Sequence, residues 1–479
     1  MQLERHLLLS GFPTDSKMYL DLHAPWDGRF VARIAQAGPI EAWLAARAAE
    51  RAFPHTRQLA PRRRAGILRA LAAAVRDQGE ALVLLLRDEG GKPVSLGRVE
   101  VERSLATLEA CAAEALRSDV GLDTPRAVGR RMVVSRTAPR GPTLALTAFA
   151  SPLLGVCLKL GAAVAAGCPI VVRPSPRTPS PALALGLALV NAGWPEGAIS
   201  VLPCDEGVAD HLVADPRFAT VTFACPQRAS WRTPERCERR GLVLDRHTHV
   251  TVLIEADADL DATVEQLARD TYAHAGQLCT SMQRILVHER VHAEVCARFA
   301  LAAAAVPRGD PGREDVVCGP IIDADEAASI EAFLMRAETL GATRLVGGDR
   351  IRNLVTPTAL RVDTQVAAPL LDLLSDEASG PVAVIEPYAS LEAALHSLNR
   401  QQRLSDTGLY TRSMAKVWQV FERLDGGALV HNGHPHGVAA VPKGAAHEGS
   451  TDVPVRQTAG EARRAMDTLC EARSLFLNG

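Results

Sequence analysis

Aromatic side chains and unbalanced charge are both scarce in this 479-residue sequence. Phe, Trp and Tyr together make up 4% of the residues, which leaves little material for a surface that would stack on nucleic-acid bases. Lys and Arg total 53 against 55 for Asp and Glu, so no excess of positive charge attracts nucleic acid or an anionic membrane. We therefore expect neither nucleic acid nor a membrane as a partner.

The ten cysteines are scattered, and no two of them have the spacing of CxxC or of a paired zinc motif. The N-terminus lacks the features of a secretion signal. Reduced thiols in a cytoplasmic protein without a metal site are therefore the simplest interpretation. His431, His434 and His436 could ligate a metal, but without a further ligand a polar loop is the favoured interpretation.

The usual nucleotide fingerprints are missing as well. No GxGxxG follows an expected strand, and neither GxxxxGK[ST] nor GxSxG occurs. A dinucleotide would therefore have to be bound by another geometry. The apolar run over residues 152–172, with a single charge at Lys159, is long enough to cross a bilayer. Its glycines, alanines and Pro169 instead favour a buried helix followed by a buried strand.

Hydrophobic patterning divides the chain into a helical first part and two α/β regions. Residues 41–117 are patterned as consecutive helices, and residues 118–140 as an exposed strand pair. From Thr143 onward short apolar strands alternate with helices, and the alternation restarts after Asp245. Strands that alternate with helices of this length are typical of βαβ units. We therefore expect two parallel sheets in series, each covered on both faces.

One cysteine stands at an unusual place in this pattern. Cys279 ends the sequence Gly276-Gln277-Leu278-Cys279, which connects a helix expected over 259–275 to a strand expected over 283–288. A cysteine at such a connection can be partly exposed and polarised, as a nucleophilic thiolate must be. A small buried hydrophobe is the commoner role of a free cysteine. The local sequence leaves both roles open.

The surrounding motifs favour the nucleophile, because they resemble those of the aldehyde dehydrogenase superfamily. That superfamily reads GQxC around its catalytic cysteine, with LELGG, a strand and a DADxD segment upstream. The corresponding stretch here runs from Leu244 through the strand VTVLI to Asp261. Further matches, in the superfamily's order, are APRGPTLAL, VVRPSPRTPSPAL, NAGWPEGAISVLP, DPRFATVTF, DEASGPVAVIEPY and HEG. The resemblance covers residues 20–475.

The resemblance implies a thiol mechanism with Cys279 as nucleophile and Asp245 in the place of the general-base glutamate. In the superfamily the thiolate adds to an aldehyde, while an Asn side chain and the Cys backbone N–H stabilise the oxyanion; hydride then passes to NAD(P)+, and an activated water releases the acid. Here the PWNFP oxyanion segment reads Ala148-Phe149-Ala150-Ser151-Pro152, with Ala150 in place of Asn. Asp245 is shorter than Glu by one methylene, about 1.5 Å.

Further substitutions fall at positions that contact the implied cofactor, NAD or NADP, in the superfamily. The KPSE segment reads Arg173-Pro174-Ser175-Pro176, so its ribose-binding Glu is lost. The FTGS turn reads Phe223-Ala224-Cys225-Pro226, where a cysteine allows less close approach than a glycine and a proline lacks an N–H for phosphate. In EExF, Glu377 is retained and Ser379 replaces Phe. We expect cofactor contacts at Arg173, Ser175 and Glu377, with weak or absent binding.

Two further features allow a functional and a structural interpretation. The acidic run from Glu255 to Asp261 lacks the glycine and glutamate of a calcium loop, since Ala262 and Ala268 stand at those positions. A solvated turn with a helix N-cap is therefore favoured. Arg284 follows Cys279 by five positions and could meet an anionic substrate group, although such an arginine more often forms an ion pair on the surface.

The fold class that follows is α/β and aldehyde dehydrogenase-like, with two three-layer domains on open parallel sheets and a small β oligomerisation element. We expect a cofactor-binding, Rossmann-like domain over 1–117 and 141–244, a catalytic thiol domain over 245–440, and an oligomerisation element over 118–140 and 441–479. The implied assembly is a homodimer or homotetramer. The implied activity is NAD(P)-linked oxidation of an aldehyde, or acyl transfer, through Cys279, weakened or altered by the substitutions. The alternative is a catalytically inactive homologue that serves as a structural or regulatory partner.

Overall fold

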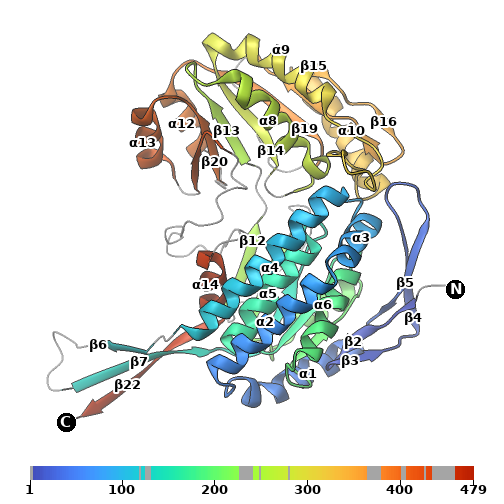
Figure 1. Ribbon diagram of the computed structural model, residues 1–479, viewed down its shortest axis with the longest axis vertical. Helices are drawn as coiled ribbons and strands as arrows, with labels where there is room; N and C mark the ends of the chain where they lie inside the picture. The colour runs from blue at the N-terminus through green and yellow to red at the C-terminus, as the bar shows by residue number, and fades with distance from the viewer. Residues whose placement is uncertain are drawn as a thin grey trace.

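Two large β-sheets, built from successive parts of the chain, form the body of the molecule, and a narrow arm projects from it (Figure 1). The computed structural model describes residues 4–117, 120–123, 131–225, 241–246, 250–278, 281–363, 379–400, 406–425, 428–433 and 459–478. The two-domain α/β fold class expected from the sequence is confirmed.

The first sheet has seven strands in the order β12-β11-β8-β9-β10-β2-β3. Its first five strands are parallel neighbours, whereas β2 and β3 pair antiparallel at one edge. The strands are β2 (Leu7–Leu9), β3 (Phe12–Thr14), β8 (Thr143–Leu146), β9 (Ile170–Arg173), β10 (Ile199–Val201), β11 (Thr220–Cys225) and β12 (Gly241–Arg246). Because β9 and β10 lie on one side of β8 and β11 and β12 on the other, the strand order reverses between β8 and β11.

Helices cover both faces of this sheet. The helices are α1 (Pro39–Thr56), α2 (Pro61–Asp77), α3 (Gly79–Gly90), α4 (Val94–Leu116), α5 (Pro152–Ala166), α6 (Ser180–Asn191) and α7 (Glu206–Ala214). Helices α2 to α6 share one large apolar core, and α1 and α7 share a second core on the opposite face. All fifteen residues of α5 are buried, which explains why its sequence is apolar on every side.

The second sheet also has seven strands, in the order β15-β18-β19-β14-β13-β20-β21. All neighbours are parallel except β15, which pairs antiparallel with β18. The strands are β13 (Val250–Ile254), β14 (Met282–His288), β15 (Thr343–Val346), β18 (Thr358–Arg361), β19 (Val382–Tyr388), β20 (Thr407–Tyr410) and β21 (Leu429–His431). Here the order reverses between β13 and β20.

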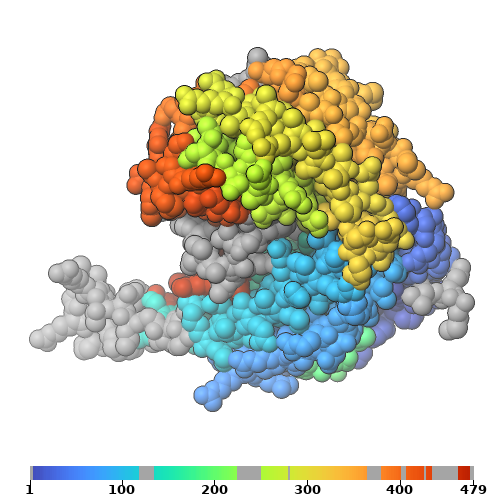
Figure 2. All heavy atoms as spheres, turned by 45° about the horizontal axis from the view of Figure 1, so that its top comes forward, coloured from blue at the N-terminus to red at the C-terminus, as the bar shows by residue number. Residues whose placement is uncertain are grey.

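Helices also cover this second sheet on both faces. They are α8 (Leu260–Tyr272), α9 (Glu289–Ala305), α10 (Ala324–Thr339), α12 (Leu391–Asn399) and α13 (Met414–Arg423). Helices α8, α9 and α10 contribute to one core, and α12 and α13 to a smaller core on the other face. The lobe that carries this sheet rests on α3 and α4 of the first lobe (Figure 2), where the Val94 amide donates to Pro311 O at 2.9 Å and Arg98 forms an ion pair with Glu314.

The projecting arm joins a middle segment of the chain to its C-terminal segment. It consists of β6 (Val120–Asp123), β7 (Arg131–Pro139) and β22 (Cys470–Asn478), and β22 pairs antiparallel with β7 over nine residue pairs. Helix α14 (Ala459–Thr468) anchors this arm, because its Ala462 and Met466 are buried in the core shared by α4 and α5.

Five strands near the N-terminus were not predicted from the sequence. They are β1 (Glu4–Arg5), β4 (Met18–His23) and β5 (Phe30–Gln36), which form a three-stranded sheet, together with the edge strands β2 and β3. Residues 152–172 form α5 and β9, as expected. In the part of the chain that the structure describes, no helix is long and apolar enough to cross a membrane.

Candidate active site

The carboxyl ends of β8 and β11 mark the point where the strand order of the first sheet reverses. In open α/β sheets, ligands bind in the crevice outside the carboxyl ends of the strands at such a point. The turn from Thr147 to Ser151 follows β8 there and leads into α5, which begins with Pro152 at its first helical position. Topology therefore places the segment aligned with PWNFP at the expected crevice.

A buried ion pair holds this turn in place. Lys92 and Glu100 contact each other, and each side chain is only 4% exposed. Lys92 Nζ donates to Ala150 O at 2.7 Å, while Glu100 Oε1 accepts the backbone amides of Leu153 and Leu154 at 2.9 and 3.1 Å. Glu100 therefore satisfies the N-terminal amides of α5, which lacks a capping side chain of its own. The turn is rigid, and Ala150 contributes no side-chain donor to it.

The segment before Cys279 has an unusual backbone. Helix α8 ends at Tyr272, three residues earlier than expected, and residues Ala273–Gly276 form a short turn. His274, Ala275 and Gly276 have φ values of 51°, 54° and 68°, all in the left-handed region. Three such residues in succession, two of them not glycine, are costly, by about 1–3 kcal/mol for each strained residue. Backbone strain of this kind is concentrated at functional sites.

Gln277 locks this turn to the rest of the lobe. Its Nε2 donates to His274 O and to Pro320 O, both at 3.1 Å, and its Oε1 accepts the Ile322 amide at 2.9 Å. Gly276 is required here, because a Cβ on it would lie 2.0 Å from Gly380 O. These contacts fix the chain that leads to Cys279. Cys279 itself lies outside the described residues, as does Glu377.

His274 is a functional candidate that the sequence reasoning missed. Its side chain is fully buried, and neither ring nitrogen has a hydrogen-bond partner within the described residues. Burial and the positive charge of Lys92 hold the pKa of His274 well below its ordinary value, so the imidazole is neutral and carries one N–H donor. Each buried polar atom without a partner costs about 1–3 kcal/mol. The only signal in the sequence was the position of this histidine beside GQxC.

Two of the three expected cofactor contacts, Arg173 and Ser175, lie at the same edge of the first sheet as the turn after β8. Arg173 ends β9 and is buried, and its Nη2 donates to Cys204 O at 3.0 Å. Ser175 Oγ accepts the Arg177 amide at 3.2 Å. Asp245 belongs to β12, where its backbone pairs with Ala224 of β11; its side chain lies outside the described set.

The polar groups at this edge suit a dinucleotide. Arg173 supplies a buried cation at the end of β9. Thr178 and Ser180, where α6 begins, face Gly90 and Glu89 of α3 instead. Cys225 ends β11 beside the crevice, and Pro226 lies outside the described residues. The described groups can therefore hold phosphate or ribose oxygens, and the effect of the Cys225-Pro226 turn stays a prediction.

The comparison with known families decides which superfamily this arrangement represents. The sequence profile described as the aldehyde dehydrogenase family matches residues 12–458, nearly the whole chain. The chain belongs to the aldehyde dehydrogenase family. The resemblance stated from the motifs is thereby confirmed, and membership indicates an oxidoreductase of a family that uses nicotinamide cofactors.

Individual relatives are similar to this chain over most of their lengths. The succinate-semialdehyde dehydrogenase [NADP(+)] of Escherichia coli (strain K12) is 28% identical over 416 residues, 86% of this chain and 85% of that protein. Aspartate-semialdehyde dehydrogenase 1 of Pseudomonas canavaninivorans is 27% identical over 441 residues, 90% of this chain and 92% of that protein. Aldehyde dehydrogenase 21 of Physcomitrella patens, solved with the reaction product succinate, superposes with a TM-score of 0.90 at 27% identity, covering 100% of this chain and 98% of that one.

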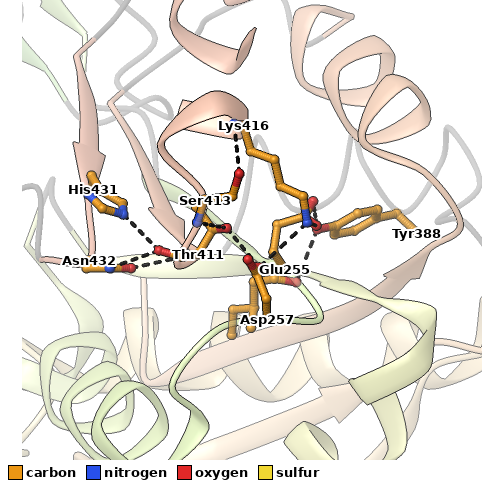
Figure 3. Close-up of polar contacts among 9 residues, drawn as sticks. Glu255, Asp257, Tyr388, Thr411, Ser413, Lys416, His431 and Asn432 are labelled. Atoms are coloured by element: carbon orange, nitrogen blue, oxygen red, sulfur yellow. Dashed lines mark hydrogen bonds and ion pairs between the residues drawn. The ribbon is translucent and has the colours of Figure 1, made fainter. Parts of the chain in front are cut away.

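The acidic run forms the turn that the sequence suggested, with Asp257, Asp259 and Asp261 exposed, but its first residue, Glu255, is buried. Glu255 is 2% exposed; its Oε1 accepts the Tyr388 hydroxyl at 2.7 Å and its Oε2 contacts Lys416 Nζ at 2.6 Å (Figure 3). Asp257 accepts the Thr411 hydroxyl at 2.8 Å. The N-cap was correctly placed, since Asp259 accepts the Ala262 amide. Glu255 departs from the expectation because it directly follows the buried strand β13, before the turn begins.

Two other expectations need correction. His431 lies in β21 rather than in a loop, and its Nε2 contacts Thr411 O at 2.8 Å (Figure 3); His434 and His436 lie outside the described residues. Arg284 is neither at the surface nor free for a substrate, because it is buried and paired with Glu386 of β19, and it also donates to Ser397 Oγ at 2.7 Å. No cluster of metal ligands occurs in the described ranges.

Proposed function

We propose that this aldehyde dehydrogenase oxidises an aldehyde to an acid with NAD(P)+ through a thioester on Cys279, at a rate lowered by its substitutions. The observation that carries the proposal is the left-handed turn held by Gln277, because it fixes the backbone that leads directly to Cys279. Strain and buried polar contacts of this kind are uncommon where a cysteine merely fills a core.

In the proposed reaction the Cys279 thiolate adds to the aldehyde carbonyl, and the Cys279 backbone N–H is one donor to the oxyanion. The nicotinamide supplies a hydride acceptor when bound. Asp245 then activates the water that cleaves the thioester, across a gap about 1.5 Å longer than a glutamate would leave. Acyl transfer to another nucleophile uses the same thioester.

Arg173, Ser175 and Glu377 are the proposed cofactor contacts. The buried guanidinium of Arg173 at the end of β9, beside the point where the strand order reverses, supports this location. Because a proline and an alanine-cysteine pair replace ribose and phosphate contacts, we expect weak binding, with a Kd of about 1 mM, or roughly −4 kcal/mol.

We further propose the division into a cofactor-binding domain over 1–117 and 141–244, a thiol domain over 245–440 and an oligomerisation element over 118–140 and 441–479. The pairing of β7 with β22 in the projecting arm supports an assembly role, and we propose a homodimer or homotetramer. A cytoplasmic location is proposed because the cysteines lack disulfide spacing. Light scattering of the pure protein measures the assembly.

A calorimetric titration with NAD+ and with NADP+ tests the cofactor proposal, and a panel of aldehydes tests the reaction. The relatives' names make succinate semialdehyde and sulfoacetaldehyde reasonable members of that panel. We expect millimolar binding and slow, Cys279-dependent acid formation. Micromolar binding would mean that the cofactor site is intact. Undetectable binding of both nucleotides would favour the alternative, an inactive homologue with a structural or regulatory role, for which the side chain lost at Ala150 is the supporting observation.

A further inference from the structure

The loop that follows β9 stands where dinucleotide-binding sheets contact the adenosine ribose. Strand β8, helix α5 and strand β9 form one βαβ unit whose two strands pair in parallel, and β8 borders the point where the strand order reverses. In sheets of this kind a carboxylate beyond such a unit accepts a hydrogen bond from the 2′-hydroxyl of NAD, whereas an arginine accommodates the 2′-phosphate of NADP. The charge of the loop after β9 therefore bears on the choice of nucleotide.

This loop is basic. Residues 170–180 contain Arg173 and Arg177 and no aspartate or glutamate. Arg173 is buried and donates to Cys204 O at 3.0 Å. The Arg177 side chain is 46% exposed, and its backbone is held by the Ser175 hydroxyl, which accepts the Arg177 amide at 3.2 Å. Of the two arginines, Arg177 is the one that a ligand can reach.

Carboxylates from two other elements approach the loop, and both are already engaged. Glu89 of α3 accepts the Ser180 amide at 3.1 Å, but it is only 2% exposed and takes part in a buried ion pair. Asp323 forms an ion pair with Arg177 and also caps the N-terminus of α10 in the second lobe. Arg177 therefore lies where the second lobe meets the carboxyl edge of the first sheet, with a single carboxylate as its recorded ion-pair partner.

We propose that this protein selects NADP+ over NAD+, and that the Arg177 guanidinium binds the adenosine 2′-phosphate. The inference rests on the function proposed above, since it assumes that a nicotinamide nucleotide occupies this crevice. A guanidinium forms paired, charge-assisted hydrogen bonds with a phosphate, which carries about two negative charges at neutral pH against one on Asp323. Because an ion pair between partly exposed side chains contributes little to stability, Arg177 can exchange Asp323 for the phosphate.

Calorimetric titrations of the parent protein with NADP+ and NAD+ test this selection without any turnover. Titrations with 2′,5′-ADP and 5′-AMP repeat the comparison without the nicotinamide, because these two compounds differ only in the 2′-phosphate. We expect NADP+ to bind with the millimolar Kd proposed above and NAD+ to bind at least about tenfold more weakly, with the same order for 2′,5′-ADP over 5′-AMP. Raising the NaCl concentration from about 50 to 500 mM should reduce the preference, because salt screens the charge of the phosphate.

Three variants test the assignment to Arg177. Arg177→Gln removes the charge, and we expect it to weaken NADP+ binding by about tenfold and to leave NAD+ within about twofold of the parent. Asp323→Asn keeps an acceptor for the helix N-cap but removes the competing charge, so NADP+ should bind about threefold more tightly and NAD+ equally well. Arg313→Gln is the matched control and should change neither affinity, because Arg313 is another exposed arginine paired with an aspartate, Asp315. Thermal unfolding shows that each variant is folded.

Equal affinities of the parent for NADP+ and NAD+ would overturn the proposal, and so would a preference for NADP+ that a folded Arg177→Gln retains in full. If none of the four compounds binds to the parent, the proposed dehydrogenase function itself fails, and this inference falls with it. Binding without a preference counts against the inference alone, so the titrations distinguish the two failures.

Discussion

At one edge of the second sheet the buried polar groups have hydrogen-bond or ion-pair partners, and at the other edge the buried side chain of His274 has none in the part of the chain that the structure describes. At the carboxyl ends of β13 and β20, where the strand order reverses, Glu255 has a partner for each oxygen and Lys416 lies between two carboxylates (Figure 3). At the amino ends of β13 and β14, the backbone is left-handed at His274 and Ala275, and His274 has unpaired ring nitrogens in the described structure.

This difference indicates what each edge is for. The carboxyl edge is where an open α/β sheet would ordinarily bind a ligand, but here the described residues Glu255, Asp257 and Lys416 form ion pairs with one another. The amino edge retains costs of several kcal/mol in strain and unpaired groups, which are expected at a site that acts on a ligand. Changes at the first edge should alter stability, and changes at the second should alter chemistry.

The largest expected effect concerns thiol reactivity. Burial raises the pKa of Cys168, Cys204 and Cys296 to about 11 and that of Cys318 to about 12. At pH near 7.5, a thiol with pKa 8.5 is roughly 10% ionised and one with pKa 11 roughly 0.03%, so Cys279 should react with sub-stoichiometric iodoacetamide at least about 10²-fold faster than these four. Peptide mapping measures the order of labelling, and faster labelling of any of the four would remove the distinction between Cys279 and core cysteines.

Two matched substitutions at the carboxyl edge should lower the stability of the protein by different amounts. Glu255→Gln leaves Lys416 facing an amide at a buried position, and we expect the free energy of unfolding to fall by about 2–3 kcal/mol. Asp257→Asn makes the same chemical change on a side chain that is 37% exposed, and we expect a loss below about 1 kcal/mol. Urea denaturation measures both. Equal losses would mean that burial does not set the strength of this cluster.

A buried carboxylate in the first lobe predicts a pH dependence. Burial raises the pKa of Glu89 from 4.5 to about 7, although Arg5 contacts it at 2.9 Å and Ser180 N donates to it. Because the folded state holds this proton more tightly than the unfolded chain, its contribution is present below about pH 4.5 and is lost as pH rises through 7. Between about pH 5 and 8, the free energy of unfolding of the parent should fall by about 2 kcal/mol more than that of Glu89→Gln. Denaturation of both proteins across this pH range measures the difference. A parent stability that rises with pH relative to Glu89→Gln would show that Arg5 keeps the carboxylate ionised.

The smallest expected effect is at an exposed ion pair on the same lobe as the two edges. Arg298 of α9 contacts Asp261 and also Glu294, and all three side chains are more than a third exposed. Solvent and salt screen such pairs. Arg298→Gln should therefore change neither the unfolding midpoint nor the rate of aldehyde oxidation. A clear change in the midpoint would mean that surface charge contributes to this lobe as much as Glu255 does.

Strand–helix alternation was sufficient to predict the two sheets, because parallel strands buried on both faces are apolar throughout and their helices are long. Helix α5 was predicted with its observed ends, since Pro152 and Gly167 mark them. Strands β1, β2 and β3 were missed because each has only two or three residues, and β3 contains Pro13. Strands β4 and β5 were missed although they have six and seven residues. The end of α8 was missed because no sequence rule marks Ala275 as left-handed.

The parts of the site that lie in sequence motifs could be predicted, and the parts that depend on tertiary contacts could not. GQxC located Gln277 and Gly276, and the structure supplies the reason in their contacts with Pro320, Ile322 and Gly380. Nothing in the sequence showed that Lys92 would meet Ala150 across 58 positions. Nor could charge patterning show that Glu255 and Arg284 would be buried, because their partners Lys416 and Glu386 come from strands and helices far along the chain.

We propose above that this chain oxidises an aldehyde through the Cys279 thiol. A single-turnover measurement of reduced nicotinamide tests this proposal. Enzyme in excess is mixed with succinate semialdehyde and saturating NAD+ or NADP+, and reduced nicotinamide is followed by absorbance for the parent and Cys279→Ser. We expect up to one equivalent of reduced nicotinamide per aldehyde with the parent and none with Cys279→Ser. Formation of equal amounts by both proteins would contradict it.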